Sequence, residues 1–87
     1  MTTGQQWWVY MVQTRAGRLY TGITTDIERR FGEHCDTGSV RQAKFFRTDP
    51  AHAVVYREAA ANRSAASRRE AAIKKLNRRQ KCQLAGL

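Results

Sequence analysis

The chain has 87 residues, which is enough for one domain with a single modest hydrophobic core. Sixteen Lys and Arg against seven Asp and Glu leave a net charge of +9, which favours a polyanionic partner, either nucleic acid or an anionic membrane surface. No apolar run approaches the ~20 residues that span a bilayer, and residues 1–6 lack the pattern of a signal peptide. The composition therefore argues against a membrane-spanning protein.

The two cysteines, Cys35 and Cys82, lie far apart in the sequence and lack metal-ligand spacing. Two thiols do not make a disulfide framework, so we expect reduced thiols and a cytoplasmic protein. We also expect a single domain over residues 1–87, with frayed ends at residues 1–6 and 82–87.

Residues 7–12, Trp-Trp-Val-Tyr-Met-Val, predict a strand that is apolar on both faces and therefore central in a sheet. Side-chain alternation places Val9 and Met11 on one face and Tyr10 on the other. The following residues 13–18 contain an Ala-Gly pair and predict a hairpin turn.

Residues 19–23 then predict an antiparallel partner strand. Tyr20 on this strand comes close to Tyr10 in some registers, although the sequence does not fix the register. A helix follows, with Asp26 or Thr25 as its N-cap.

One face of this helix mixes apolar and polar side chains, since Ile27, Arg30, Phe31 and His34 fall at i, i+3, i+4 and i+7. In one interpretation, Arg30 and His34 reach solvent from the edge of the core. In the other, they form a polar site at the end of the strand, shared with Tyr20.

Residues 39–47 predict a short second helix in which basic groups alternate with aromatic ones. Such a surface suits nucleic acid. For Phe45 and Phe46 we favour the other interpretation, that they belong to the core and are flanked by solvated charges. Residues 53–57 predict the third strand.

The last third of the chain predicts one helix to about Arg79, capped by Asn62 or Ser64. Glu70 is the only acid in this basic helix, and it either pairs with Lys74 at i+4 or binds a metal ion. We expect an inward stripe made of Ala65, Arg69, Ala72, Ile73 and Leu76.

Four features follow one another along the chain: Trp8-Val9-Tyr10, Tyr20-Thr21-Gly22, Arg30 with His34, and a late Glu70. In this order they resemble the motifs of the GIY-YIG nuclease superfamily. The chain is most similar to the small stand-alone bacterial proteins of the UPF0213, or YhbQ-like, group. The resemblance implies a fold of the α/β class (α+β type): a three-stranded antiparallel sheet flanked by helices, in the order β-β-α-α-β-α. The elements predicted from residue 7 onward follow the same order.

The resemblance also assigns roles to residues of this chain. It implies catalytic roles for Tyr10, Tyr20, Arg30, His34 and Glu70, with Glu70 as the metal ligand. The chain departs from the family pattern at Trp8, which replaces a Gly, and at Thr21, which replaces Ile or Val. Ile23 stands where some DNA-repair members have Lys, so we expect Lys44 to supply that basic contact.

The implied function is a metal-dependent endonuclease that hydrolyses phosphodiester bonds in DNA, in repair or other nucleic-acid processing. Its implied cofactor is one divalent ion, Mg²⁺ or Mn²⁺, which needs only one or two protein carboxylates. Arg30 offers a fixed fork of donors to phosphate. Tyr20 is the family candidate for the general base, although histidine titrates nearer neutral pH and leaves His34 as the alternative.

Partners follow from charge as well as from the resemblance. We expect phosphate contacts, without reading of bases, from Arg41, Lys44, Arg47 and Lys74. The alternative function is a nucleic-acid-binding module of the same fold that cuts weakly or not at all, since charge supports both equally. A protein partner that supplies specificity is compatible with the absence of a separate DNA-binding domain, and a membrane partner is not expected.

Overall fold

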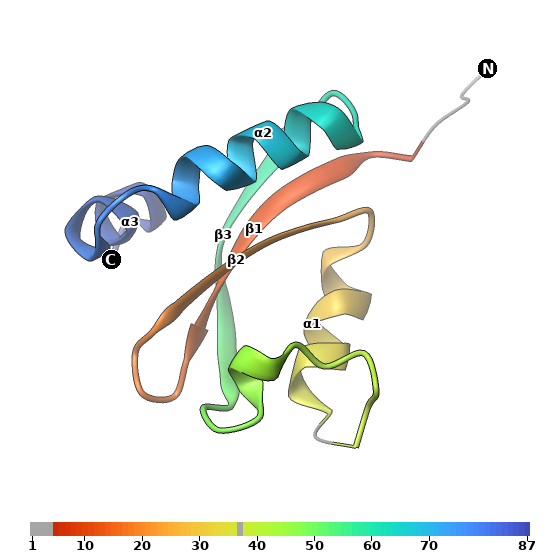
Figure 1. Cartoon of the computed structure of the whole chain (residues 1–87), viewed down its shortest axis with the longest axis vertical. Helices are drawn as coiled ribbons and strands as arrows, with labels where there is room; N and C mark the ends of the chain where they lie inside the picture. The colour runs from red at the N-terminus through yellow and green to blue at the C-terminus, as the bar shows by residue number, and fades with distance from the viewer. Residues whose placement is uncertain (1–4, 37) are drawn as a thin grey trace.

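The computed structural model describes residues 5–36 and 38–87 of the chain. A three-stranded antiparallel sheet forms its centre, and helices lie on both faces of the sheet (Figure 1). In chain order the elements are β1 (Trp7–Thr14), β2 (Leu19–Thr24), α1 (Ile27–Cys35), the short 3-10 helix η1 (Lys44–Phe46), β3 (Ala51–Ala60), α2 (Arg63–Lys74) and α3 (Arg78–Ala85).

The sheet has the strand order β2-β1-β3, so β1 is central, as its two apolar faces predicted. The register pairs Tyr10 with Gly22 on β2 and with Arg57 on β3. The predicted fold class, an antiparallel three-stranded sheet flanked by helices, is confirmed. The third strand is longer than the predicted residues 53–57.

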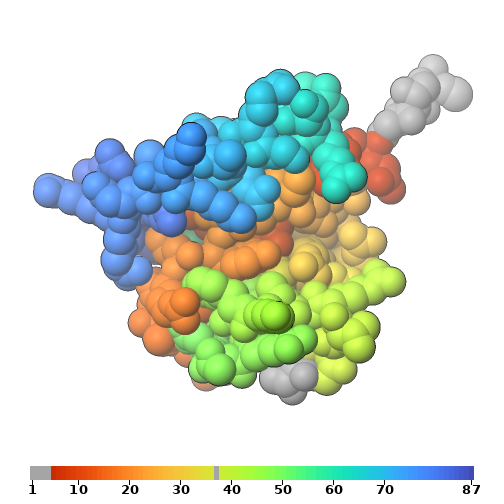
Figure 2. All heavy atoms as spheres, viewed as in Figure 1, coloured from red at the N-terminus to blue at the C-terminus, as the bar shows by residue number. Residues whose placement is uncertain are grey.

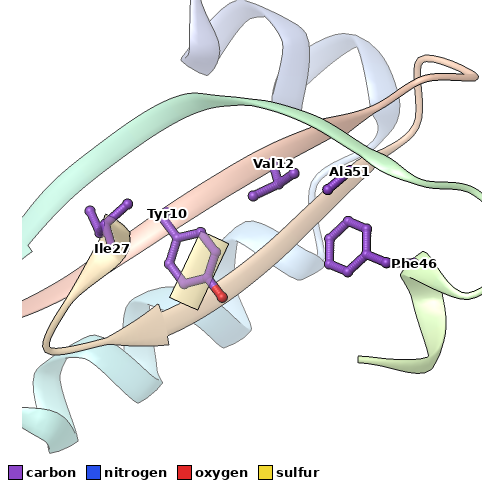
Figure 3. Packing of buried hydrophobic residues seen from close by; sticks show 5 residues of the cluster. All are labelled: Tyr10, Val12, Ile27, Phe46 and Ala51. Atoms are coloured by element: carbon purple, nitrogen blue, oxygen red, sulfur yellow. The ribbon is translucent and has the colours of Figure 1, made fainter. Parts of the chain in front are cut away.

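Each face of β1 belongs to a different hydrophobic cluster. On the α1 face, the buried residues are Tyr10, Val12, Ile27, Phe46 and Ala51, and Phe46 reaches from η1 toward Val12 and Ala51 (Figure 3). On the α2 face, the buried residues are Val9, Met11, Ala66 and Ile73. The predicted alternation along β1 is therefore confirmed.

The helix starts follow local capping chemistry. Asp26 accepts a hydrogen bond from the Arg29 backbone N–H at 3.0 Å and caps α1. Asn62 caps α2 in the same way, through the Ala65 N–H at 2.8 Å. No helix within the described residues is long and apolar enough to cross a membrane.

The prediction of a second helix over residues 39–47 is wrong, because only the three residues of η1 are helical there. This segment is instead tied to α1 by polar contacts. The buried Gln42 side chain donates to the His34 carbonyl at 2.7 Å, and the Arg41 carbonyl accepts from Arg30 at 2.6 Å. The Arg41 carbonyl thus accepts from Arg30 and not from a backbone N–H four residues later, as it would in a helix.

The prediction of one final helix to about Arg79 is also wrong, because the chain breaks between α2 and α3. Asn77 starts α3 with a capping box, in which its side chain accepts from the Gln80 N–H and Gln80 accepts from the Asn77 N–H. The expected frayed end at residues 82–87 differs from the structure, in which α3 continues to Ala85 and Gly86 caps it at φ 74°. Residues 1–4 of the other expected frayed end lie outside the described residues.

Candidate active site

A buried hydrogen bond joins β1 to the last turn of α1. The Tyr10 hydroxyl and His34 Nε2 lie 2.8 Å apart, and the two residues are only 1% and 0% exposed. Burial, with a smaller contribution from the Arg30 guanidinium, lowers the pKa of His34 to about 4. Burial, followed by the nearby Tyr20, raises the pKa of Tyr10. Both members of this pair are therefore neutral at pH 7.

The other nitrogen of the His34 ring supports the neutral state. Nδ1 is buried and has no hydrogen-bond partner within the described part of the chain. Nδ1 lacks a partner in the neutral ring as well, but a protonated ring would leave a charged N–H unpaired there, which costs more in a buried place than an unpaired neutral group.

Gly22 allows the Tyr10 ring to lie against β2. A Cβ atom on Gly22 would fall 2.7 Å from the Tyr10 hydroxyl oxygen and 2.9 Å from Cζ. Gly22 is also the cross-strand partner of Tyr10. The glycine of the Tyr20-Thr21-Gly22 motif is thus required by a close approach of a side chain to the strand.

Tyr20 joins the same group of rings from β2. Its ring centroid lies 5.2 Å from that of His34, 4.9 Å from that of Phe46 and 6.4 Å from that of Tyr10. The register therefore brings both tyrosines to the α1 face, which is the arrangement that the sequence left open. Phe46 is buried and packs 4.4 Å from the His34 ring, so its interpretation as a core residue is confirmed.

Arg30 lies one turn before His34, and its side chain remains 26% exposed. Its Nη1 donates to Glu33 Oε1 at 2.8 Å and to the Arg41 carbonyl at 2.6 Å. Sequence reasoning missed Glu33, although its i+3 spacing from Arg30 was a readable signal. No sequence signal pointed to the Arg41 carbonyl, because any residue has one.

Glu70 sits on α2, on the opposite face of the sheet from His34. Its Oε2 lies 3.1 Å from Lys74 Nζ, and its side chain is 23% exposed, so the predicted i+4 ion pair is present. It borders the buried Ala66 and Ile73. The expected inward position of Ala72 is wrong, because that residue is exposed.

Within the described chain Glu70 forms no hydrogen bond or ion pair with the other predicted catalytic residues, yet its charge reaches Tyr10. Burial and Tyr20 are the main reasons for the raised pKa of Tyr10, and the Glu70 carboxylate adds a smaller contribution in the same direction. The structure thus gathers Tyr10, Tyr20 and His34 in ring contact, with Arg30 beside them and Glu70 within electrostatic reach.

The donor set for a metal ion is sparse. Residues 5–36 and 38–87 contain no cluster of three or more His, Cys, Asp and Glu side chains suited to a metal. Such a set does not fit zinc, which takes three or four protein ligands. It fits Mg²⁺, which keeps several waters and takes one or two carboxylates. The buried Thr21 hydroxyl, which has no hydrogen-bond partner in the described chain, is a further oxygen donor on the α2 face.

The predicted phosphate-contacting residues lie at the surface. Arg41, Lys44 and Arg47 are exposed near η1, whereas Lys74 is engaged by Glu70. Arg41 is also 3.9 Å from Glu33, which connects it to Arg30 through one carboxylate. The structure therefore brings Arg41 next to Arg30 and leaves Lys44 and Arg47 as separate surface charges.

Known proteins are similar to this chain over most of its length. Residues 6–83 match the family model described as the GIY-YIG catalytic domain. A UPF0213 protein of Pseudomonas aeruginosa is 49% identical over 78 residues, covering 90% of this chain and 72% of that protein. The UPF0213 protein YhbQ of Escherichia coli is 40% identical over 75 residues, covering 86% and 72%.

A solved structure agrees with these sequence matches. The solution NMR structure of a UPF0213 protein from Bacillus halodurans superposes with a TM-score of 0.57 at 35% identity, covering 94% of this chain and 84% of that one. The chain therefore belongs to the GIY-YIG domain family, among the UPF0213 (YhbQ-like) proteins, and has the nuclease-like fold of that family.

Proposed function

We propose that this protein is an endonuclease that hydrolyses phosphodiester bonds in DNA with the help of one divalent ion, Mg²⁺ or Mn²⁺. The observation that carries the proposal is the cluster of Tyr10, Tyr20 and His34 with Arg30 at its rim, in a chain of the GIY-YIG family. This set combines a guanidinium for phosphate with hydroxyl groups for proton transfer.

Charge develops on the phosphate oxygens when a phosphodiester bond is cleaved. A bound divalent ion supplies positive charge to those oxygens, and Glu70 is the carboxylate that would hold it. Arg30 remains charged at every working pH, and its fork of donors matches a phosphate. Its side chain is partly exposed, and both of its hydrogen bonds use Nη1, so the N–H groups of Nε and Nη2 remain to donate to a phosphate oxygen.

Tyr20 is the better candidate for the general base. His34 is neutral, but its lowered pKa of about 4 makes it a weak base, and its Nε2 is already bonded to Tyr10. Tyr20 is only half-buried and lies at the rim of the cluster. In this assignment His34 and Tyr10 position each other, and Tyr20, as the phenolate, takes the proton from the attacking water and becomes the neutral phenol.

A second candidate function is a nucleic-acid-binding module that does not cut. Two ion pairs favour it, because Glu70 is paired with Lys74 and Arg30 is paired with Glu33. Glu70 would need to release Lys74 before it holds a metal ion, whereas Arg30 keeps N–H donors that Glu33 does not use. Surface pairs stabilise by only about 1 kcal/mol or less, and the Lys74–Glu70 pair is partly exposed, so its exchange is a small cost and the nuclease remains preferred.

Incubation with DNA separates the two functions. The purified protein is mixed with single-stranded, duplex, branched and flapped DNA, and with RNA of the same sequences, in Mg²⁺, Mn²⁺ or EDTA. We expect cleavage of DNA that requires the metal ion and is absent in Arg30→Ala. Binding without cleavage of any substrate in either metal would support the binding module instead.

A further inference from the structure

An open groove of about 320 Å³ lies at the end of β2, and of the candidate catalytic residues only Arg30 is among its lining residues. It runs between α1 on one side and the start of α2 on the other. In Figure 2 the cyan atoms at the start of α2 and the yellow atoms of α1 lie on either side of orange β2 atoms. The groove is lined by Trp7, Ile23, Thr24, Thr25, Arg29, Arg30, Glu33, Arg41 and Arg63.

The groove is strongly cationic. Four arginines and one glutamate line it, which leaves a net charge of +3. The single carboxylate, that of Glu33, is already shared by Arg30 and Arg41. Within the described chain, Arg29 and Arg63 form no ion pair with any carboxylate. Two guanidinium groups on opposite walls are therefore available to an anionic ligand.

Trp7 adds an aromatic surface to this charge. It is the first residue of β1 and is only half-buried, packed at the margin of the α2-face cluster. The Arg63 guanidinium lies 5.8 Å from its ring centroid. A Trp7 that only packed in the core would be buried beneath α2, whereas this Trp7 also lines the groove. An indole beside guanidinium groups is the pairing that single-stranded nucleic-acid sites use for base stacking and phosphate contact.

We propose that this groove binds an unpaired segment of the nucleic-acid strand, with one base stacked on Trp7 and its phosphates bound by Arg29 and Arg63. The inference rests on the proposed function, because Arg30 belongs both to the groove and to the candidate active site. It specifies the substrate class as single-stranded or flapped nucleic acid. Bases inside a continuous duplex are stacked on each other and do not offer a free face to Trp7.

Binding measured without catalysis tests the role of Trp7. Fluorescence anisotropy in EDTA compares a labelled single-stranded oligonucleotide with a blunt duplex of the same length. Trp7→Leu keeps an apolar side chain but removes the aromatic face, whereas Trp7→Phe keeps both. We expect Trp7→Leu to weaken single-strand binding roughly 5- to 150-fold, the loss of one stacked base, and Trp7→Phe to lose far less. Duplex binding should be the same in all three proteins.

A pair of charge variants on α2 tests the groove itself. Arg63→Gln removes a guanidinium that lines the groove, and Arg68→Gln removes one from the same helix that bonds only to Ser64. Both change the net charge equally. We expect Arg63→Gln to weaken single-strand binding and to flatten its salt dependence, and Arg68→Gln to do so much less. Equal effects of the two variants would mean that general electrostatic attraction explains the binding, and the proposal for the groove would be wrong.

The possible results separate this inference from the proposed function. If folded Trp7→Leu binds single strands as tightly as the wild-type protein and still cleaves with the metal ion, the proposal for the groove is wrong and the proposed nuclease function is unaffected. If Trp7→Leu loses single-strand binding but the wild-type protein cleaves no substrate, the proposal for the groove is supported and the proposed nuclease function is wrong. Absence of any nucleic-acid binding by the wild-type protein overturns both.

Discussion

On the α1 face of the sheet, polar groups are buried and bonded to each other, whereas on the α2 face the carboxylate of Glu70 stays at the margin. Tyr10 and His34 are almost fully covered and both neutral. Glu70 is partly exposed and pairs with a lysine on its own helix. The first arrangement is rigid because each group is costly to leave unpaired. The second is easily exchanged, because surface ion pairs are weak.

Neutralising the carboxylate of the α2 face should have the largest effect. We expect Glu70→Gln to reduce cleavage to the level seen in EDTA, since no other carboxylate is assigned to the ion. The melting temperature should change little, because an exposed i+4 pair contributes only about 0.5 kcal/mol. Glu28→Gln is the matched control, since Glu28 is an exposed acid on α1 that pairs with Arg57. Full metal-dependent activity of Glu70→Gln would remove Glu70 from the site.

Removing one hydroxyl from the α1 face comes next. Tyr20→Phe should lower the rate of cleavage by roughly two to four decades, the range for loss of a positioned acid–base group. Ring packing against Phe46 is retained, so folding and single-strand binding should not change. His34→Gln should cost less, because it acts through Tyr10. An active Tyr20→Phe beside a folded but inert His34→Gln would transfer the general base to His34.

The buried pair should also make stability depend on pH. The pKa of His34 is about 4 in the folded protein and about 6.5 in an unfolded chain. Between pH 6.5 and pH 4, His34 binds a proton in the unfolded chain but not in the folded protein. The free energy of unfolding therefore falls as the pH is lowered through this range, by up to roughly 3 kcal/mol.

Urea unfolding at pH 7, 5.5 and 4 measures this loss. His34→Gln should lose that part of the pH dependence, whatever its absolute stability. His52→Gln is the control, since the exposed His52 on β3 should leave the wild-type dependence in place. A pH dependence that is the same in wild-type and His34→Gln proteins would mean that His34 titrates normally.

The sequence was informative wherever a periodic pattern decides the structure. Alternation along β1 predicted that Tyr10 lies on the face opposite Val9 and Met11, and the 3.6-residue repeat after Asp26 predicted that Arg30 and His34 share a helix face with Ile27. The segment after α1 was mispredicted because its path depends on Gln42 and the Arg41 carbonyl bonding to α1, which are contacts between segments that no local pattern encodes.

One feature was readable in the sequence but was not used, and another was not readable. Asn77 followed at the third position by Gln80 is a capping signal inside the predicted final helix, and it marks the break between α2 and α3. Trp7 and Arg63 are 56 positions apart, and only the fold brings them to one groove. Capping chemistry is local and predictable, whereas the groove depends on how α2 lies over the strands.

The smallest expected effect comes from Gly22, at the point where the two tyrosine motifs meet. An added Cβ would lie 2.7 Å from the Tyr10 hydroxyl, and the ring has no free space because Tyr10 is buried and bonded to His34. Gly22→Ala should therefore destabilise the protein by about 1–3 kcal/mol, the usual cost of overpacking. Gly32→Ala on α1 is the control, since its Cβ meets nothing within 4 Å and alanine favours the helix by about 0.5–1 kcal/mol.

A double-mutant cycle shows whether the clash acts through the Tyr10–His34 bond. Tyr10→Phe removes both the nearest atom and the hydrogen bond, so its cost and that of Gly22→Ala should not add when the two are combined. Urea unfolding of the four proteins gives the coupling energy. Strict additivity would mean that Gly22→Ala is accommodated by a shift of β2 and not by displacement of the Tyr10 hydroxyl. In that case the glycine would serve the backbone of β2 alone, and the α1 face would be less rigid than its contacts imply.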